Sequence, residues 1–113
     1  MIALPAPVLT GKLSVEAALK ARKSSRSYGD GGLGLPEVSQ LLWAAQGVNR
    51  ANGMRTAPSA GALYPMEVYL VAGEVEGLAA GVYRYRSRDH SLLSLSTGDQ
   101  RQELAAVALG QSC

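Results

Sequence analysis

The chain has 113 residues, of which 47% are hydrophobic, and this size and composition predict one globular domain over residues 1–113. Its 11 basic and 9 acidic residues give a net charge of +2, too small for the clustered basic face of a nucleic-acid-binding protein. The single cysteine, Cys113, excludes an intramolecular disulfide and a multi-cysteine metal site. The N-terminus lacks the basic segment of a signal peptide and no run of about 18 apolar residues occurs, so we expect a soluble cytoplasmic protein without a membrane partner.

The N-terminal part predicts an extended segment, residues 1–12, and then a helix from an N-cap at Ser14 to about Arg22. Apolar residues recur on it at the i, i+3, i+4 spacing of one helix face: Val15, Ala18 and Leu19. Arg22 and Arg26 are four residues apart with Ser24 between them, so a frayed helix end would let these side chains converge on one anion. A solvated basic end that complements the helix dipole is the alternative.

A glycine-rich string, Gly29–Gly34, matches the G-x-G-x-x-G pattern of dinucleotide-binding proteins. We interpret it as a loop, because it follows a helix end and lacks the acidic residue expected about 20 positions later. The next helix is predicted from Pro36 to about Gln46, with Gly47 at its end. Its apolar residues are spaced to face the core: Val38, Leu41, Leu42 and Ala45. Trp43 lies off that stripe, which indicates either a second buried face, such as a subunit interface, or packing over an adjacent loop.

The stretch Arg55–Val71 passes from a Pro-Ser-Ala-Gly loop into an apolar, β-branched run. Ser59 can accept a backbone N–H from the turn that follows, and Gly61 allows another surface to approach the main chain closely. Pro65 prevents helix continuation, and Glu67–Val71 is expected to be a strand with apolar side chains on both faces. A capped turn with free N–H groups beside a buried strand suits an anionic or planar ligand. An ordinary turn-to-strand connection is the alternative.

The C-terminal part predicts a hairpin and a helix. Tyrosines alternate with other residues in Gly81–Arg86, which indicates a half-buried strand, and Leu92–Ser96 follows it across a turn at Ser87–His90. Asp99 and Gln102 give a capping-box-like start to the last helix. This helix is expected to pack through its apolar residues: Leu104, Ala105, Ala108 and Leu109. The order of helices and strands predicts an α+β fold.

Side chains for independent catalysis are few. The only histidine, His90, lies in a predicted turn without an obvious serine or cysteine partner, so a catalytic triad is not supported. No group of residues has metal-ligand spacing, and no pair of carboxylates suggests acid and base roles. We therefore assign no catalytic residue and no metal site, and expect that a cofactor carries any chemistry.

Several motifs resemble those of the nitroreductase-like flavoproteins, and most closely their SagB-type branch, the azoline dehydrogenases of thiazole- and oxazole-forming peptide pathways. The motifs extend over nearly the whole chain: Arg22–Tyr28, Leu41–Gly47, Pro58–Val71, Gly81–Tyr85, His90 and Ala108–Gln111. Ala62 and Tyr64 stand where many other relatives carry Asn and Gln, which fits the SagB-type branch. The resemblance implies the three-layer α+β nitroreductase fold, of which this chain would form the N-terminal half, with helices packed on a small, mainly antiparallel sheet.

By the same resemblance the cofactor is FMN, with NAD(P)H as a candidate electron donor. Arg22, Lys23 and Ser24 would hold the FMN phosphate and ribityl chain. Arg26 would approach the pyrimidine side of the isoalloxazine, and Gln111 would place an amide near the ring. The chemistry agrees, because arginine forks suit phosphate and a fixed cation beside the flavin favours its anionic reduced form.

In the family the FMN lies at a dimer interface, so a partner chain would supply the loop residues Pro58, Ser59, Ala60 and Gly61. We expect a homodimer or larger oligomer, or a second polypeptide that completes the fold. By the resemblance, the later strands and helices, and the lysine–tyrosine pair associated with azoline oxidation, would belong to the other half of the fold, and we expect this half alone to leave apolar surface open to water.

Two functions follow from the resemblance. The first is an FMN-dependent oxidoreductase that transfers hydride through the flavin, either in NAD(P)H-driven reduction of nitro or quinone compounds or in azoline dehydrogenation. The second is a catalytically silent, truncated module that oligomerises through the nitroreductase dimer surface.

Overall fold

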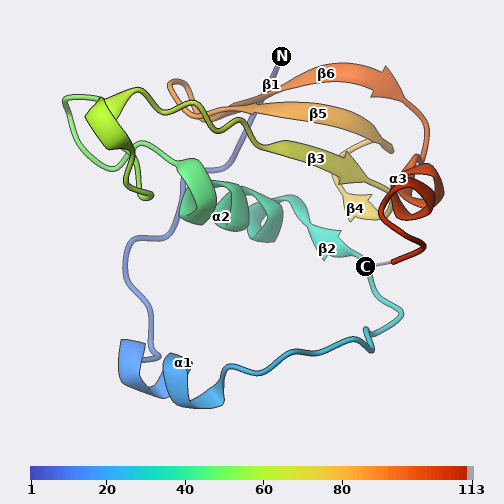
Figure 1. The fold of residues 1–113 in the computed structure, drawn as a ribbon, viewed down its shortest axis with the longest axis horizontal. Helices are drawn as coiled ribbons and strands as arrows, with labels where there is room; N and C mark the ends of the chain where they lie inside the picture. Colours follow the sequence, from blue (N-terminus) through green and yellow to red (C-terminus); the bar gives the residue numbers. More distant parts are fainter. Residues whose placement is uncertain (112–113) are drawn as a thin grey trace.

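The computed structural model describes residues 1–111, so Cys113 lies outside the described residues. The elements follow one another as shown in Figure 1: β1 (Ile2–Ala3), α1 (Val15–Ala21), β2 (Leu33–Gly34), α2 (Leu35–Gln46), the 3-10 turn η1 (Ala60–Ala62), β3 (Tyr69–Ala72), β4 (Val75–Glu76), β5 (Gly81–Arg86), β6 (Ser91–Thr97) and α3 (Arg101–Val107). Within this part of the chain, no helix is both long and apolar enough to cross a bilayer.

The main sheet has the strand order β1-β6-β5-β3, and its neighbouring strands are antiparallel. Its centre is the β5–β6 hairpin, in which Tyr85 lies opposite Leu92. On the other side of β5, β3 places Tyr69 opposite Arg84. A small separate pair, β2 and β4, is parallel. The predicted α+β class and the mainly antiparallel sheet are confirmed.

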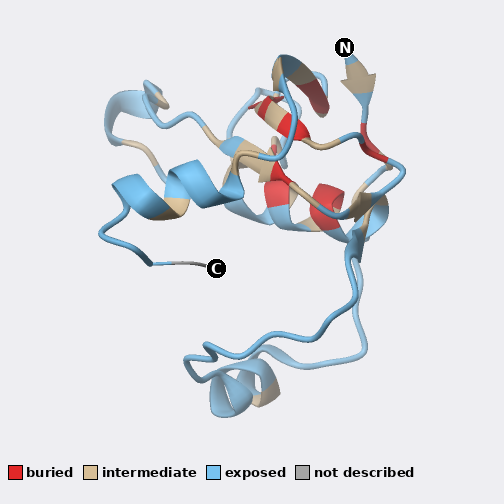
Figure 2. Ribbon diagram, turned by 90° about the vertical axis from the view of Figure 1, so that its right-hand side faces the viewer, coloured by how far each residue is buried: buried red, intermediate tan, exposed pale blue. Residues whose placement is uncertain are grey.

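The core lies between α2 and one face of the main sheet, where the buried residues gather (Figure 2). Its buried apolar side chains come from six elements or their flanks: Leu4, Val38, Leu42, Ala72, Leu78, Tyr83, Tyr85 and Leu92. The alternation in β5 produces this face, because every second residue from Gly81 to Tyr85 is buried and the residues between them are half-buried. Full burial of a leucine such as Leu92 contributes about 1.5–3 kcal/mol.

The inward face of α2 differs from the prediction. Leu41 is 62% exposed and Ala45 is exposed as well, so the expectation that both face the core is wrong. Ser39 turns inward instead, because its hydroxyl donates to the Pro5 carbonyl oxygen at 2.5 Å and so satisfies a buried polar group.

The end of α2 at Gly47 is confirmed. The Gly47 N–H donates to the Trp43 carbonyl oxygen at 2.7 Å, and a Cβ on Gly47 would lie only 2.2 Å from Trp43 Cδ1. The chain can therefore turn tightly here only with glycine. Trp43 is half-buried beside the following loop, whose Thr56 hydroxyl donates to the carbonyl oxygens of Trp43 and Ala44 at 3.3 and 2.9 Å.

The first helix is held away from the rest of the chain. Ser14 is its N-cap, as predicted, with Oγ accepting the Ala17 N–H at 3.1 Å. Its apolar face is nevertheless open, since Val15 is 71% and Leu19 is 68% exposed. Figures 1 and 2 show α1 on two extended arms, apart from the main sheet and α2. The apolar stripe therefore packs on nothing within residues 1–111.

The last helix also departs from the prediction. It begins at Arg101, and the predicted capping box between Asp99 and Gln102 is wrong, because the Asp99 carboxylate accepts the backbone N–H and the guanidinium of Arg101 at 3.1 and 2.7 Å. Leu104 is 46% and Leu109 is 92% exposed, so packing through these two residues is wrong as well.

Two further segments shift relative to the expected elements. β3 occupies Tyr69–Ala72 instead of 67–71, and Tyr69 is 51% exposed, so burial on both faces does not extend to the start of this strand. The Gly-rich loop is confirmed except at its end, where Leu33–Gly34 forms β2 against Val75–Glu76.

Candidate functional site

The arm after α1 carries the first group of predicted site residues. The helix ends at Ala21 and Arg22 has an extended backbone, so the frayed helix end that would let Arg22 and Arg26 converge on one anion is not formed. Arg26 and Ser24 instead line a hollow of about 760 Å³, open to solvent, whose other lining residues are Ser25, Tyr28 and Gln111. Arg22 and Lys23 lie beside this hollow in the chain but do not line it.

Gln111 reaches the hollow through the turn that follows α3. The Gly110 N–H donates to the Ala105 carbonyl oxygen at 2.9 Å, with Gly110 at φ +74°, and the Gln111 N–H donates to the Ala108 carbonyl oxygen at 3.1 Å. A φ in this region favours glycine, so Gly110 allows the chain to reverse here. Sequence positions far apart in the chain are thus brought to one place, where a guanidinium, three hydroxyls and an amide are available as donors.

The second group, Pro58–Gly61, lies on a tightly folded loop. Ser59 Oγ accepts the Tyr64 N–H at 2.8 Å, which confirms that Ser59 accepts a backbone N–H from the turn that follows it, although its side chain makes no N-cap bond to η1 itself. The loop turns through three left-handed residues: Gly61 at φ +65°, Ala62 at φ +53° and Tyr64 at φ +46°. Left-handed backbone is unfavourable for alanine and tyrosine, so this loop stores strain of the kind found at binding sites.

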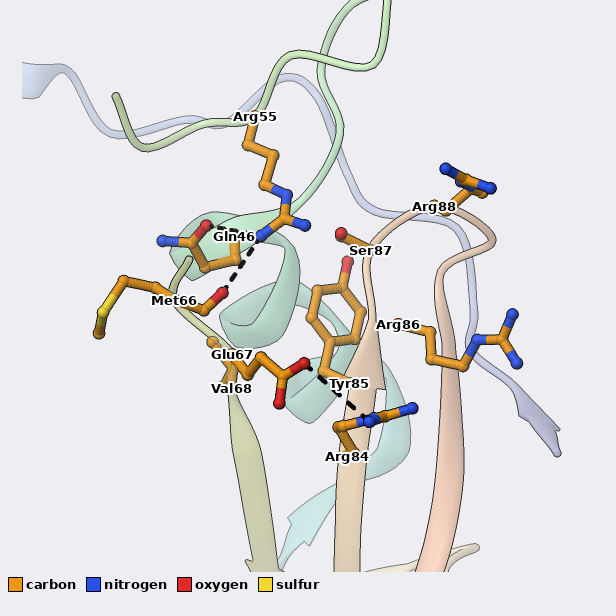
Figure 3. A pocket seen from close by; sticks show the side chains of 10 residues that line it. All are labelled: Gln46, Arg55, Met66, Glu67, Val68, Arg84, Tyr85, Arg86, Ser87 and Arg88. Atoms are coloured by element: carbon orange, nitrogen blue, oxygen red, sulfur yellow. Dashed lines mark hydrogen bonds and ion pairs between the residues drawn. The ribbon is translucent and has the colours of Figure 1, made fainter. Parts of the chain in front are cut away.

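Arg55 holds this loop in place (Figure 3). Its backbone N–H donates to the Tyr64 hydroxyl at 3.2 Å, and its guanidinium lies 4.9 Å from the centre of the Tyr64 ring. The same guanidinium donates to Gln46 Oε1 at 3.2 Å and to the Met66 carbonyl oxygen at 3.3 Å. Arg55 therefore ties both ends of the loop to the end of α2.

The two groups of predicted site residues are not together in one chain. Figure 1 shows η1 at one end of the molecule, and α3 and the arm before β2 at the other. Within the loop, Ser59 is half-buried, whereas Pro58, Ala60 and Gly61 are exposed. The two groups therefore do not form one site within the described part of a single chain.

A serine–histidine contact escaped the sequence analysis, and the expectation that His90 has no serine partner is wrong. His90 Nε2 lies 2.7 Å from Ser39 Oγ and 2.9 Å from the Pro5 carbonyl oxygen, while Nδ1 lies 2.9 Å from the Tyr85 hydroxyl. Burial raises the pKa of Tyr85, so its neutral O–H can donate to Nδ1 while Nε2–H donates toward Pro5.

This contact is structural. Ser39 is 1% exposed and its hydroxyl donates to a backbone carbonyl, so it is not placed to attack a substrate. His90 joins the N-terminal segment, α2 and the hairpin turn, and it does so from a left-handed backbone at φ +48°.

Comparison with known proteins identifies the family. The nitroreductase family model matches residues 19–111, and the chain belongs to this family. It is 40% identical over 100 residues to "Putative nitroreductase MJ1384" of Methanocaldococcus jannaschii, which covers 88% of this chain and 50% of that protein. A crystal structure of a "putative nitroreductase" from Ralstonia eutropha superposes with a TM-score of 0.77 at 40% identity, over 88% of this chain and 45% of that one.

The fold also occurs in the Escherichia coli microcin synthetase McbBCD complex, with a TM-score of 0.58 and 22% identity over 97% of this chain and 45% of that chain. The chain thus spans about half the length of the nitroreductases it matches. The expectation that it forms half of a nitroreductase fold is confirmed.

Proposed function

We propose that the chain is a subunit of an FMN-dependent oxidoreductase, with the flavin bound between two chains. One observation carries this proposal: Ser24, Arg26 and Gln111 line one hollow, whereas the Pro58–Gly61 loop is exposed at the other end of the molecule. Two copies related by a two-fold axis would bring the hollow of each to the loop of the other. Family membership supports the same arrangement.

The donors in the hollow fit FMN in chemical type. Ser24 and Arg26 would bind the ribityl and pyrimidine part, and Arg22 and Lys23, on the same extended arm, would close on the phosphate. The Gln111 amide can both donate to and accept from a ring edge. When bound, FMN would supply the hydride chemistry, for which Arg26 would provide a fixed positive charge and an orientation.

The partner's loop would contribute shape and backbone N–H groups. Its strained conformation is already formed in the single chain and is held by Arg55, so little ordering would be needed on binding. A second polypeptide that supplies the other half of the fold would cover the apolar surface left open on α1 and α3.

For the substrate we propose an azoline-bearing peptide, with NAD(P)H-driven reduction of nitro or quinone compounds as the competing assignment. The preference for an azoline-bearing peptide rests on Ala62 and Tyr64 in the loop motif, because these two residues match the SagB-type pattern.

Flavin retention tests the proposal. The purified chain is incubated with FMN, desalted on a sizing column, and its visible spectrum and mass are recorded. We expect a flavin band in a dimer or larger oligomer, lost in Arg26→Ala and kept in Arg50→Ala, an exposed arginine outside the hollow. A colourless oligomer would refute flavin binding by this chain and support the silent module that only oligomerises.

A further inference from the structure

A second hollow, of about 430 Å³, lies at the end of β5 beside the segment that follows α2 (Figure 3). We call it the arginine pocket, after four of its lining residues: Arg55, Arg84, Arg86 and Arg88. Glu67 is the one acidic residue among its ten lining residues, so the lining has a formal charge of +3, against +2 for the whole chain. The net positive charge of the molecule is therefore concentrated here.

Carboxylates neutralise this charge only in part. Two ion pairs involve the pocket: Arg84 with Glu67 at 4.0 Å and Arg86 with Asp89 at 3.3 Å. Within residues 1–111, Arg55 and Arg88 form no salt bridge. The Arg84–Glu67 pair is at the distance limit of a salt bridge, and half-exposed ion pairs contribute little to stability. An anionic ligand could therefore displace the Glu67 carboxylate at a low free-energy cost.

The pocket is largely preformed. Arg55 is held by Gln46 and by the Met66 carbonyl oxygen, and Figure 3 shows it facing Tyr85 across the hollow. On β5, the side chains of Arg84 and Arg86 are only 39% and 38% exposed, so the aliphatic parts of these side chains are packed against the protein. Ordering these side chains on binding would cost little conformational entropy.

We infer that the arginine pocket binds a ligand with a pyrophosphate group. Figure 3 shows Arg55 above Tyr85 and Arg84 below it, whereas Arg86 and Arg88 extend away from Arg55, so the cations are spread along the pocket instead of meeting at one point. A ligand with charge on two adjacent groups would therefore contact more of them than a single small anion. Guanidinium groups bind phosphate oxygens with paired hydrogen bonds, and the Tyr85 and Ser87 hydroxyls offer further donors.

The pocket is separate from the hollow proposed for FMN. It shares no lining residue with the hollow around Arg26. It borders the Pro58–Gly61 loop, since Arg55 and Met66 stand on either side of that loop in the chain. A bound anion would therefore contact the group that holds the loop.

Calorimetric titration of the 113-residue chain with sodium pyrophosphate, without FMN or divalent metal, tests this inference. We expect saturable binding that weakens by about tenfold or more in the double variant Arg84→Ala/Arg88→Ala and changes by less than about twofold in Arg50→Ala. Affinity should also fall as sodium chloride is raised from about 50 to about 200 mM. Circular dichroism of each variant establishes that it is folded.

Two further titrations separate the alternatives. Arg22→Ala and Arg26→Ala should leave pyrophosphate binding intact, even where they abolish flavin retention. Loss of pyrophosphate binding in these variants would assign the anion to the flavin hollow and overturn the inference, whereas failure to retain FMN with intact pyrophosphate binding would refute only the proposed function. Citrate, a polycarboxylate, should bind more weakly than pyrophosphate; tighter citrate binding, or no saturable heat with pyrophosphate, would also overturn it.

Discussion

Replacing Arg55 with alanine should release the loop that holds Pro58–Gly61 without unfolding the core. The substitution removes two guanidinium hydrogen bonds, at 3.2 and 3.3 Å, and a contact with the Tyr64 ring at 4.9 Å. Because the bonds are long and Arg55 is half-exposed, we take about 0.5–1 kcal/mol for each of the three, or about 2 kcal/mol in total.

The stabilisation lost is comparable with the backbone strain that the Arg55 interactions oppose, since a left-handed alanine and a left-handed tyrosine cost about 1 kcal/mol or more each. The loop should therefore open about thirtyfold more often in Arg55→Ala than in the wild type. Hydrogen exchange measures this directly at Ala62 and Tyr64, whose N–H groups bond to the Ser59 carbonyl oxygen and hydroxyl.

Arg50→Ala is the matched control. Arg55→Lys should give an intermediate effect, because lysine keeps the charge but lacks the planar guanidinium that lies against the Tyr64 ring while its Nη1 donates to both Gln46 and Met66. Unchanged exchange at Ala62 and Tyr64 in Arg55→Ala would refute the role of Arg55. Equal acceleration at core positions such as Leu92 would show global destabilisation instead of loop release.

Three further predictions concern stability. His90→Ala should lower the free energy of unfolding by about 2–3 kcal/mol, because it leaves the Tyr85 hydroxyl without its partner and removes the His90 contacts with Ser39 and Pro5, which keep only their bond to each other. Denaturant unfolding measures this, and a change below about 0.5 kcal/mol would contradict the structural role of the contact. Gly81→Ala should lower the melting temperature by several degrees, because the new Cβ would lie 2.5 Å from the Ser96 carbonyl oxygen, whereas Gly11→Ala, with nothing within 4 Å, should not. The hydrogen bond from the Arg101 guanidinium lowers the pKa of the Asp99 carboxyl in the folded protein. The ionised carboxylate therefore stabilises the fold above the pKa of the unfolded state, and this contribution is lost as the pH falls through the folded-state pKa. Asp99→Asn should therefore flatten the loss of stability below about pH 4.

The parts of the fold that the sequence predicted well are those that depend on local pattern. β5 was predicted at Gly81–Arg86 because tyrosines occupy every second position, and the structure has the same bounds. The N-cap at Ser14 and the stop at Gly47 were also predictable, because each depends on one residue and its nearest turn.

Burial was harder to predict, because it depends on what lies opposite. Val15, Leu19 and Leu41 have the spacing of buried helix faces and are exposed, since no part of residues 1–111 covers them. The contact between Ser39 and His90 joins residues 51 positions apart, and no local pattern indicates such a pair. The meeting of Arg26 with Gln111 likewise depends on the whole path of the chain.

The central claim is that FMN lies between two chains, with the Arg26 hollow of one facing the Ser59 loop of the other. Arg26→Ala and Ser59→Ala would be purified separately, then mixed in equal amounts, unfolded together and refolded with FMN. Each variant alone should lose flavin, but every mixed dimer contains one site with an intact hollow and an intact loop. The account predicts that the mixture recovers about a quarter of the wild-type flavin content, since half of the dimers are mixed and each has one intact site. Recovery of no flavin in the mixture, while the refolded wild type retains it, would show that both groups act within one chain and would contradict the account.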